Sequence, residues 1–452
     1  LFSKHNLPYI ALLLIITALG SVTFFLGDEY GLGFSAAFLI ALMGAFFIFL
    51  SPSIGFAMAI FGSTNLIRLL MTLAKLESAY ILYIVLVAIF ILSWLAMIIR
   101  GNPNLPRLNA PNVTLSIILV YAIIGLTYTS NFDYGLLKTG TFFVGSYIPF
   151  FTVQIYDKRY DYLKRTLFLG ILVMYFITLV SIGYILVKGL PQWQRFTIAG
   201  AGAITFSRGM AVATLLPLIS LELFKKSWQR MILISLSILS LFILVSIATR
   251  GPVISFLMAF FIYMLLFSKL SKIKKTAITI VIIGVMVLLA TKVSTYLLAR
   301  LSSLKGVAET SAMGRMLLWR TSFEHLFDSP IIGIGTGSFN ELLPSFGKAS
   351  GLKYAHNIWL EFYLEWGILG LSLIAFFILA VLWRGYKAYL NKNIGSTQKK
   401  LLSIFITLFL FALSNAQISG DLSSNKMLYI FAGVLIALSY VHRPLRGDQC
   451  IS

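Results

Sequence analysis

The sequence has 452 residues, of which 59% are hydrophobic and only 11% are charged. A soluble protein needs about a quarter of its residues charged to cover its surface, so this composition excludes a soluble fold and indicates an all-α, polytopic membrane protein. The net charge of +21 would suggest nucleic-acid binding in a soluble protein, but here it is expected from lysine and arginine in cytoplasmic loops. A single cysteine and four histidines exclude an internal disulfide and a Cys/His metal cluster.

Apolar segments long enough to cross a bilayer recur along the whole chain. A bilayer core of about 30 Å requires about 20 apolar helical residues, which predicts 12–14 transmembrane helices here. The first apolar run is interpreted as a transmembrane helix, not as a cleaved signal peptide. The predicted spans are 7–26, 32–50, 54–71, 79–99, 113–129, 135–155, 167–187, 206–223, 231–248, 252–267, 276–291, 357–383, 401–418 and 427–441.

These spans divide the chain into three parts. Residues 1–291 form an N-terminal transmembrane bundle of about 11 spans, and residues 357–452 add about three more. Between them, residues 292–356 form one long loop, which is long enough for a few short helices at the membrane surface.

The distribution of basic residues predicts the orientation. With the N-terminus on the cytoplasmic side, every strongly basic short loop falls on that same face. Both termini are therefore expected in the cytoplasm, and the long loop 292–356 is expected on the outer face. The cations that set this orientation are Arg100, Arg107, Lys158, Arg159, Lys164, Arg165, Lys225, Lys226, Arg230, Lys269, Lys272, Lys274, Lys275, those from Arg384 to Lys400, Arg443 and Arg446.

Three arginines lie at or near the outer ends of predicted spans. Arg250 stands in "ATRGP", where Gly251 and Pro252 break the helix at the junction of two spans. Arg208 stands in the similar "TFSRGM", and Arg195 lies in the loop before it. An arginine at this depth is costly unless it is paired or lines a water-filled cavity, so these are candidate binding residues. The alternative is that each one only anchors its helix to lipid phosphates.

The long loop contains "GRMLLWRTSFEHLFDSPIIGIGTGSF". Arg315 and Trp319 are spaced as neighbours on a helix predicted at about 312–327, so Arg315 faces either a ligand or solvent. The three alternate glycines at 333–337 resemble a phosphate-binding loop but lack its flanking strand and its Lys-Ser/Thr ending. A compact turn that returns the chain to the membrane is the better interpretation.

The segment "YAHNIWLEFYLEWGILG" enters the next span. His356 lies just before the helix, and Asn357 is placed to cap it. Glu361 and Glu365 are one helical turn apart and run into the membrane, where a carboxylate suggests function. Asp421 is another carboxylate on the outer face, and a turn alone would explain it.

Together these residues suit chemistry on a phosphorylated lipid at the outer membrane surface. Arginine side chains match phosphate oxygens and would stabilise a diphosphate leaving group. A histidine or a carboxylate could take the proton of an incoming hydroxyl. No compact Asp/Glu cluster indicates a metal, so the sequence predicts no cofactor, and an activated lipid donor would have to supply the energy.

At these residues the sequence resembles the O-antigen ligase/polymerase family of bacterial membrane glycosyltransferases. The resemblance rests on "ATRGP", on the long-loop segment and on "YAHNIWLEFYLEWGILG", within residues 245–370. It implies a GT-C-like helical fold and transfer of a glycan from undecaprenyl diphosphate to an acceptor sugar at the periplasmic face of the inner membrane. The route is expected to be inverting and metal-independent.

The resemblance also implies roles for individual residues. Arg250 and Arg315 would contact the diphosphate, Arg208 and Arg195 would join them, and His356 would act on the acceptor hydroxyl, with Glu361 as a second catalytic candidate. The expected partners are the lipid bilayer, the lipid-linked donor, a glycan or lipid A–core acceptor and other polysaccharide-assembly proteins, with no nucleic acid.

Two enzymes and one transporter fit this outline. A polymerase joins lipid-linked repeat units, whereas a ligase passes the finished chain to lipid A–core. About fourteen spans favour the polymerase, since ligases of this family typically have twelve. A secondary transporter is the alternative of another class, but it should place its ionisable residues in mid-membrane and show repeat symmetry.

Overall fold

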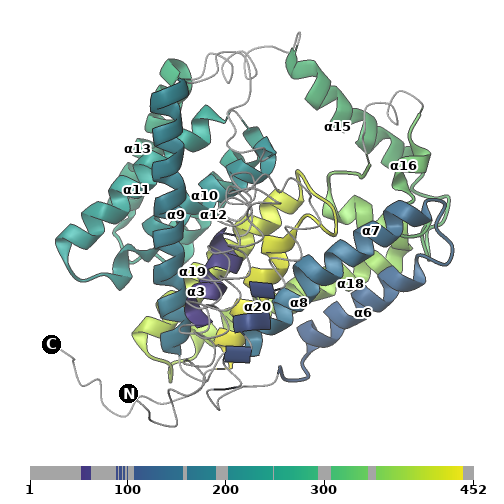
Figure 1. Ribbon diagram of the computed structural model, residues 1–452, viewed down its shortest axis with the longest axis horizontal. Helices are drawn as coiled ribbons and strands as arrows, with labels where there is room; N and C mark the ends of the chain where they lie inside the picture. Colours follow the sequence, from purple (N-terminus) through teal and green to yellow (C-terminus); the bar gives the residue numbers. More distant parts are fainter. Residues whose placement is uncertain are drawn as a thin grey trace, which may run out of the picture.

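A computed structural model of the protein describes residues 52–62, scattered positions between 88 and 99, and then 106–155, 160–189, 202–247, 249–293, 307–344 and 353–440. All regular structure in these residues is helical, and none of them lies in a strand. The expectation of an all-α polytopic membrane protein is confirmed (Figure 1). The predicted spans 7–26 and 32–50 lie outside the described residues.

The predicted spans 54–71 and 79–99 lie only partly within the described residues. The membrane helices from residue 110 onwards coincide with the other predicted spans to within a few residues at most of their ends. In chain order they are α3 (Pro52–Ala57) with the π-helix η1 (Met58–Gly62), α6 (Ala110–Ile124), α7 (Phe132–Phe142), η2 (Phe143–Tyr147), α8 (Ile148–Thr152), η3 (Val153–Ile155), α9 (Tyr160–Lys188), α10 (Ala203–Ser220), η4 (Leu221–Leu223), α11 (Ser227–Ser246), α12 (Arg250–Leu266), α13 (Lys272–Val293), α15 (Val307–Glu324), α16 (Phe339–Leu342), α18 (Ile358–Leu390), α19 (Ser396–Ala416) and α20 (Lys426–Ser439).

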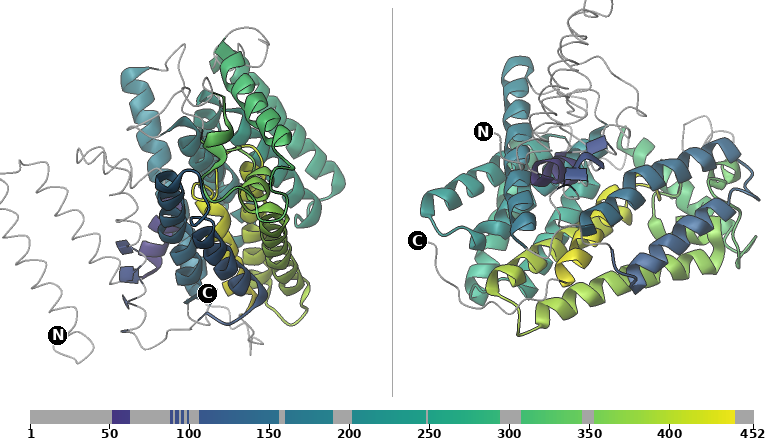
Figure 2. Two further views of the ribbon diagram at one scale, coloured as in Figure 1. Left: turned by 90° about the vertical axis from the view of Figure 1, so that its right-hand side faces the viewer. Right: turned by 60° about the horizontal axis from the view of Figure 1, so that its bottom comes forward.

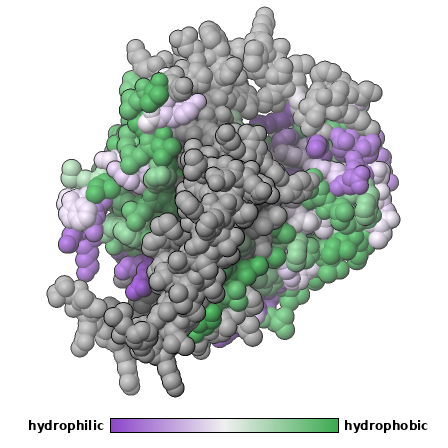
Figure 3. Space-filling model, in the orientation of Figure 1, coloured by the Kyte–Doolittle hydropathy of each residue, from purple (hydrophilic) through white to green (hydrophobic). Residues whose placement is uncertain are grey.

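Five of these helices are long and apolar enough to cross a membrane: those at 163–187, 203–223, 227–246, 358–390 and 396–416. Three shorter apolar helices, α6, α12 and α20, accompany them. Large apolar side chains remain exposed along the outer sides of these helices, as lipid contact requires. In Figure 3 hydrophobic side chains cover the lower right flank, and hydrophilic ones gather above it, towards α15 and α16.

The helices pack around a centre formed by α10, α19 and α20. Helix α10 contacts α11, α12 and α19, while α20 contacts α8, α18 and α19. The central helices are the most enclosed, with 78% of the apolar window of α10 and of α19 buried, against 33% for α9 at the edge. Figure 2 shows α18 and α6 running side by side along one edge of the bundle.

Helix α18 contains a sharp break that fixes where its first turns point. Gly367 has φ 63° and ψ −160°, a conformation that only glycine adopts readily. A side chain there would also collide with the backbone of Ile331. The segment Ile358–Trp366 is therefore set at an angle to the rest of α18, and it carries both glutamates singled out from the sequence.

Candidate functional site

The glycine-rich segment of the long loop is a turn that docks against the break in α18. Gly333, Gly335 and Gly337 all have positive φ, at 75°, 96° and 81°. A Cβ on any of them would collide with backbone, for example 2.7 Å from the Cα atoms of Thr129 and Gly135 for Gly335 and Gly337. The glycines are therefore needed for close packing of backbone on backbone, as expected of a compact turn.

Hydrogen bonds join this turn to the broken helix. The break at Gly367 frees carbonyl groups of the first segment of α18, because the normal helical donors are displaced. Ile334 N–H donates to Leu364 O at 2.9 Å, and Gly335 N–H donates to Glu365 O at 3.0 Å. The backbone that carries Glu365 is thus held by the turn as well as by its own helix.

A buried group of three charges links α7 to α18. Lys138 Nζ lies 2.8 Å from both carboxylate oxygens of Glu365 and also contacts Glu361 Oε1. All three side chains are at most 2% exposed. Charges so completely removed from water persist only when they are paired, and Lys138 pairs with both carboxylates. Glu361 Oε2 has no hydrogen-bond partner among the described residues.

Lys138 was missed in the sequence analysis, although a signal for it exists. It falls inside the predicted span 135–155, and a lysine within a span is expected to face a partner in the bundle interior. The two glutamates one turn apart were recognised, but their cation lies far away along the chain. Only the packing of α7 against α18 brings the three together.

Glu361 and Asn357 tie the start of α18 to the loop between α19 and α20, residues 417–425. Leu422 N–H donates to Glu361 Oε1 at 3.1 Å, and Asn357 Nδ2 donates to Gln417 O at 3.2 Å. Asn357 Oδ1 also accepts from the backbone of Trp359, at 3.0 Å, as the expected helix cap.

Asp421 organises the 417–425 loop from within. Its Oδ1 accepts from Ser424 N–H at 2.7 Å, while Ser424 Oγ accepts from Asp421 N–H at 2.7 Å. Ser423 Oγ donates to the same carboxylate, and Tyr134 OH points to its other oxygen at 3.4 Å. Asp421 is only 3% exposed, so it is more than the solvated turn residue that its sequence context allowed.

Arg208 clamps this loop from α10. Its Nη2 donates to Ser419 O at 2.7 Å and its Nη1 to Ser424 O at 3.3 Å. Gly420 has φ 96°, and a Cβ there would lie 3.0 Å from Arg208 Nη2, so the loop backbone can approach the guanidinium closely. The Nε atom of Arg208 is buried and makes no hydrogen bond within the described residues.

His356 lies near Arg208 and has an unusual backbone conformation. It is the one described non-glycine residue with a positive φ, 56°, and its ring lies 4.3 Å from the ring of Tyr354. Its Nδ1 is buried and has no hydrogen-bond partner among the described residues. Such an orphaned polar atom indicates a site that a ligand completes.

The surroundings of His356 keep its imidazole neutral. Burial, together with the charges of Arg315 and Arg208, lowers the pKa of His356 to about 4, against the opposing effect of Asp421. At neutral pH one ring nitrogen is therefore available to accept a proton. The same burial, with Asp421 nearby, raises the pKa of Tyr354 to about 12, so that phenol stays protonated.

Arg315 and Arg250 border the same region. Arg315 lies in α15, half-buried, and its charge acts on His356. Arg250 is the first residue of α12, and the Cα of the adjacent Gly251 faces Ile418 of the 417–425 loop, with 3.4 Å between an added Cβ and Ile418 Cγ2. Arg195 lies outside the described residues.

The structure thus brings four elements together around the 417–425 loop: α10, α12, the start of α18 and, through its charge, α15. Their functional side chains are Arg208, Arg250, His356 and Arg315, with the Lys138–Glu361–Glu365 group behind them. Among the described residues no group of three or more His, Cys, Asp and Glu could hold a metal ion. The arrangement combines guanidinium groups with a neutral proton acceptor, which suits anion binding and deprotonation of a hydroxyl.

Comparison with known proteins finds a family match in one part of the chain. Residues 235–375 match the family model described as O-Antigen ligase, a stretch that contains Arg250, Arg315, His356 and both glutamates. A search of curated proteins found no match. Through residues 235–375 the chain is therefore similar to the O-antigen ligase family, which supports an O-antigen ligase/polymerase-like membrane enzyme.

Proposed function

We propose that this protein is a membrane glycosyltransferase that transfers a glycan from undecaprenyl diphosphate to an acceptor sugar at the periplasmic face of the inner membrane. The observation that carries the proposal is His356, a neutral imidazole close to the charges of Arg315 and Arg208, whose buried Nδ1 has no hydrogen-bond partner among the described residues. A proton acceptor beside cationic groups fits a reaction in which a hydroxyl loses a proton while a diphosphate departs.

The reaction balances with these residues alone. The acceptor hydroxyl oxygen attacks the anomeric carbon of the donor as the bond from that carbon to the diphosphate oxygen breaks. The hydroxyl proton passes to His356, and the electron pair leaves with the diphosphate. Attack opposite the leaving group inverts the anomeric configuration, and no metal or nucleotide enters the step.

In this proposal some of the arginines bind the diphosphate, and Arg208 holds the 417–425 loop. We assign Arg250 and Arg315 to the diphosphate oxygens, because guanidinium groups pair with phosphate and stabilise its growing charge. Arg208 already donates to two carbonyls of the 417–425 loop, so we assign it to holding that loop and to adding positive potential. Arg195 remains a predicted diphosphate contact.

Glu361 receives a positioning role instead of the catalytic role expected from the sequence. It is 1% exposed, and its Oε1 is engaged by Lys138 and by Leu422 N–H. A carboxylate held in this way orients the loop and the start of α18.

A polymerase is our preferred form of the enzyme, and a ligase is the alternative. The preference rests on the number of predicted spans. A transporter is less well supported, because Lys138, Glu361 and Glu365 lie in the first turns of α7 and α18, near one end of the bundle, and pair with one another. A transporter would instead place its ionisable site near the membrane midplane.

Reconstitution tests this proposal. Purified protein in liposomes, supplied only with lipid-linked repeat units and EDTA, is expected to produce a ladder of longer lipid-linked glycans. A product formed only when lipid A–core is added would replace the polymerase with the ligase. No consumption of lipid-linked glycan under either condition contradicts the glycosyltransferase.

A further inference from the structure

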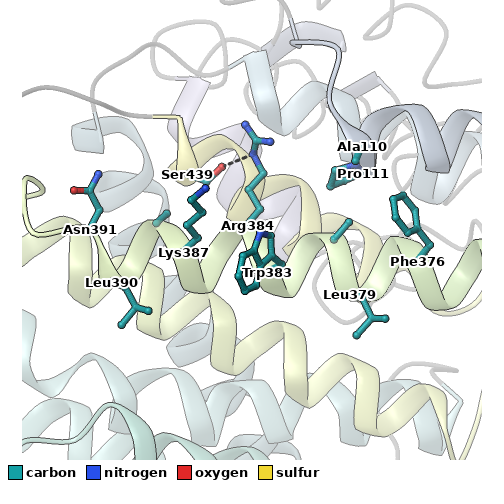
Figure 4. Close-up of a pocket in the computed structure, with 12 residues that line it drawn as sticks. Ala110, Pro111, Phe376, Leu379, Trp383, Arg384, Lys387, Leu390, Asn391 and Ser439 are labelled. Carbon is teal, nitrogen blue, oxygen red and sulfur yellow. Dashed lines mark hydrogen bonds between the residues drawn. The ribbon is translucent and has the colours of Figure 1, made fainter.

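A pocket lies far from the 417–425 loop, at the other end of α18. It has a volume of about 910 Å³ and is formed by the last turns of α18, the start of α6 and the end of α20 (Figure 4). Its lining residues are Ala110, Pro111, Phe376, Leu379, Ala380, Trp383, Arg384, Lys387, Ala388, Leu390, Asn391 and Ser439.

The length of α18 places this pocket at the opposite membrane surface from the candidate site. At 1.5 Å per residue, the unbroken part of α18 from Gly367 to Arg384 is about 26 Å long. The hydrocarbon core of a bilayer is about 30 Å thick. The pocket therefore spans the boundary between acyl chains and headgroups of the other leaflet.

The side of the pocket towards the membrane interior is apolar and exposed. Phe376, Leu379 and Trp383 are 54%, 65% and 67% exposed, and their spacing puts them on one face of α18. Exposed apolar side chains on a membrane helix contact acyl chains, and tryptophan is typical of the headgroup boundary.

The side towards the membrane surface is basic. Arg384 Nε donates to Ser439 Oγ at 3.2 Å, and its guanidinium lies 3.9 Å from the ring centre of Tyr440. The guanidinium of Arg107 approaches the same ring at 5.0 Å, and Lys387 extends beside Arg384 (Figure 4). No acidic residue is among the residues that line the pocket.

This geometry differs from that of arginines and lysines that merely reach from a helix end to water. A reaching side chain is flexible, whereas Arg384 is half-buried and held by a hydroxyl and an aromatic ring. The start of α6, with its positive dipole end, also borders the pocket. Basic pockets between transmembrane helices favour anionic lipid headgroups.

We propose that this pocket is a binding site for an anionic phospholipid of the surrounding bilayer. Its phosphate would contact Arg384 and Lys387, and one acyl chain would lie along Phe376, Leu379 and Trp383. The site is separate from glycan transfer, so its test does not depend on the proposed function.

Thermal unfolding of purified, lipid-depleted protein in detergent tests the headgroup contact. Phosphatidylglycerol is expected to raise the Tm by several degrees more than phosphatidylcholine with the same acyl chains. Lys387→Gln should remove most of this difference without lowering the Tm in detergent alone, because Lys387 is exposed. Lys226→Gln, an exposed lysine outside the pocket, is the matched control and should keep the difference.

Quenching of tryptophan fluorescence by phosphatidylglycerol with brominated acyl chains tests the acyl-chain contact. Wild-type protein should be quenched at low mole fractions of this lipid, and Trp383→Phe should remove that saturable component. Equal effects of the two headgroups on Tm, or equal losses in Lys387→Gln and Lys226→Gln, would overturn the proposal.

Discussion

At the scale of single residues, the surroundings of His356 give the strongest support for a catalytic role. It combines a positive φ, a buried nitrogen without a hydrogen bond to any described residue and a pKa lowered to about 4. Strained or unsatisfied groups of this kind persist where the surrounding structure imposes them, and they concentrate at functional sites.

Replacing His356 by alanine is expected to lower the rate of glycan transfer about 10²- to 10⁴-fold, because general-base catalysis contributes about that much. Rates measured in the reconstituted system, with membrane insertion verified, check this. His325→Ala is the matched control: His325 is half-buried and pairs with Asp328 at 2.6 Å, so its loss should leave the rate nearly unchanged. Near-normal turnover by His356→Ala would refute the role.

The lowered pKa of His356 also predicts how the transfer rate and the stability depend on pH. Because the folded pKa is about 4 and an ordinary histidine has a pKa near 6.5, protonation is penalised in the folded protein. The base form therefore persists down to about pH 4, and stability linked to this group falls as the pH drops from 6.5 towards 4. Transfer rates between pH 5.5 and 8 should show no loss assignable to His356; a midpoint near 6.5 that disappears in His356→Gln would contradict this.

At the scale of secondary-structure elements, two devices fix the start of α18. The glycine turn at 333–337 fills the break at Gly367 with backbone hydrogen bonds, and the Lys138–Glu361–Glu365 group joins α7 to the first turns of the helix. Each depends on a residue that few others can replace: Gly367, which has a positive φ, and Lys138, which is a buried cation.

Lys138→Met should strongly destabilise the protein, because it leaves two buried carboxylates without a cation. Removing one partner of a buried ion pair costs about 3–5 kcal/mol. Thermal unfolding in detergent measures this, and the triple variant Lys138→Met/Glu361→Gln/Glu365→Gln should recover part of the loss. Arg320→Ala removes an exposed ion pair with Glu324 and serves as the control, with no change in Tm expected. Equal Tm values for the two single variants would argue against the charge group.

Gly367→Ala should also destabilise the fold, by about 1–3 kcal/mol, since alanine must adopt a positive φ and its Cβ meets the backbone of Ile331. Gly183→Ala is the matched control, because Gly183 lies inside helix α9 with open space around it and alanine favours helix. Unfolding midpoints of the two variants should therefore move in opposite directions. A Gly367→Ala protein as stable as Gly183→Ala would show that the break is dispensable.

At the scale of the whole molecule, the structure separates two ends of one helical bundle. One end holds the 417–425 loop with Arg208, His356 and α15; the other holds Arg107, Arg384 and the basic pocket. Of the basic residues that set the predicted orientation, Arg107, Arg384 and Lys400 lie at this second end, where Lys400 Nζ donates to Glu222 O at 2.7 Å. This polarity gives the proposed function a definite sidedness.

Cysteine labelling tests that sidedness. In a Cys450→Ser background, Met316→Cys places a thiol on α15 at a position that is 69% exposed. A membrane-impermeant thiol reagent should label it in intact spheroplasts, whereas Lys226→Cys, at the other end of the bundle, should react only after the membrane is permeabilised. The reverse pattern would put the candidate site in the cytoplasm and remove the proposed enzyme.

The sequence by itself determined the helical membrane fold, the position of most described helices and the motifs that resemble the O-antigen ligase family. These features are local, because the length of an apolar run and the spacing of residues within one motif depend on neighbours in the chain. It also pointed to Arg250, Arg315 and His356, which stand in such motifs.

Only the tertiary structure decided how distant residues are paired. It placed Lys138 against Glu361 and Glu365, set Arg208 on the carbonyls of the 417–425 loop and changed Glu361 from a catalytic to a positioning residue in our proposal. These contacts join segments far apart in sequence. They arise because whole helices pack against each other and because charges removed from water need a partner. Neither effect can be predicted from residues that are neighbours in the sequence.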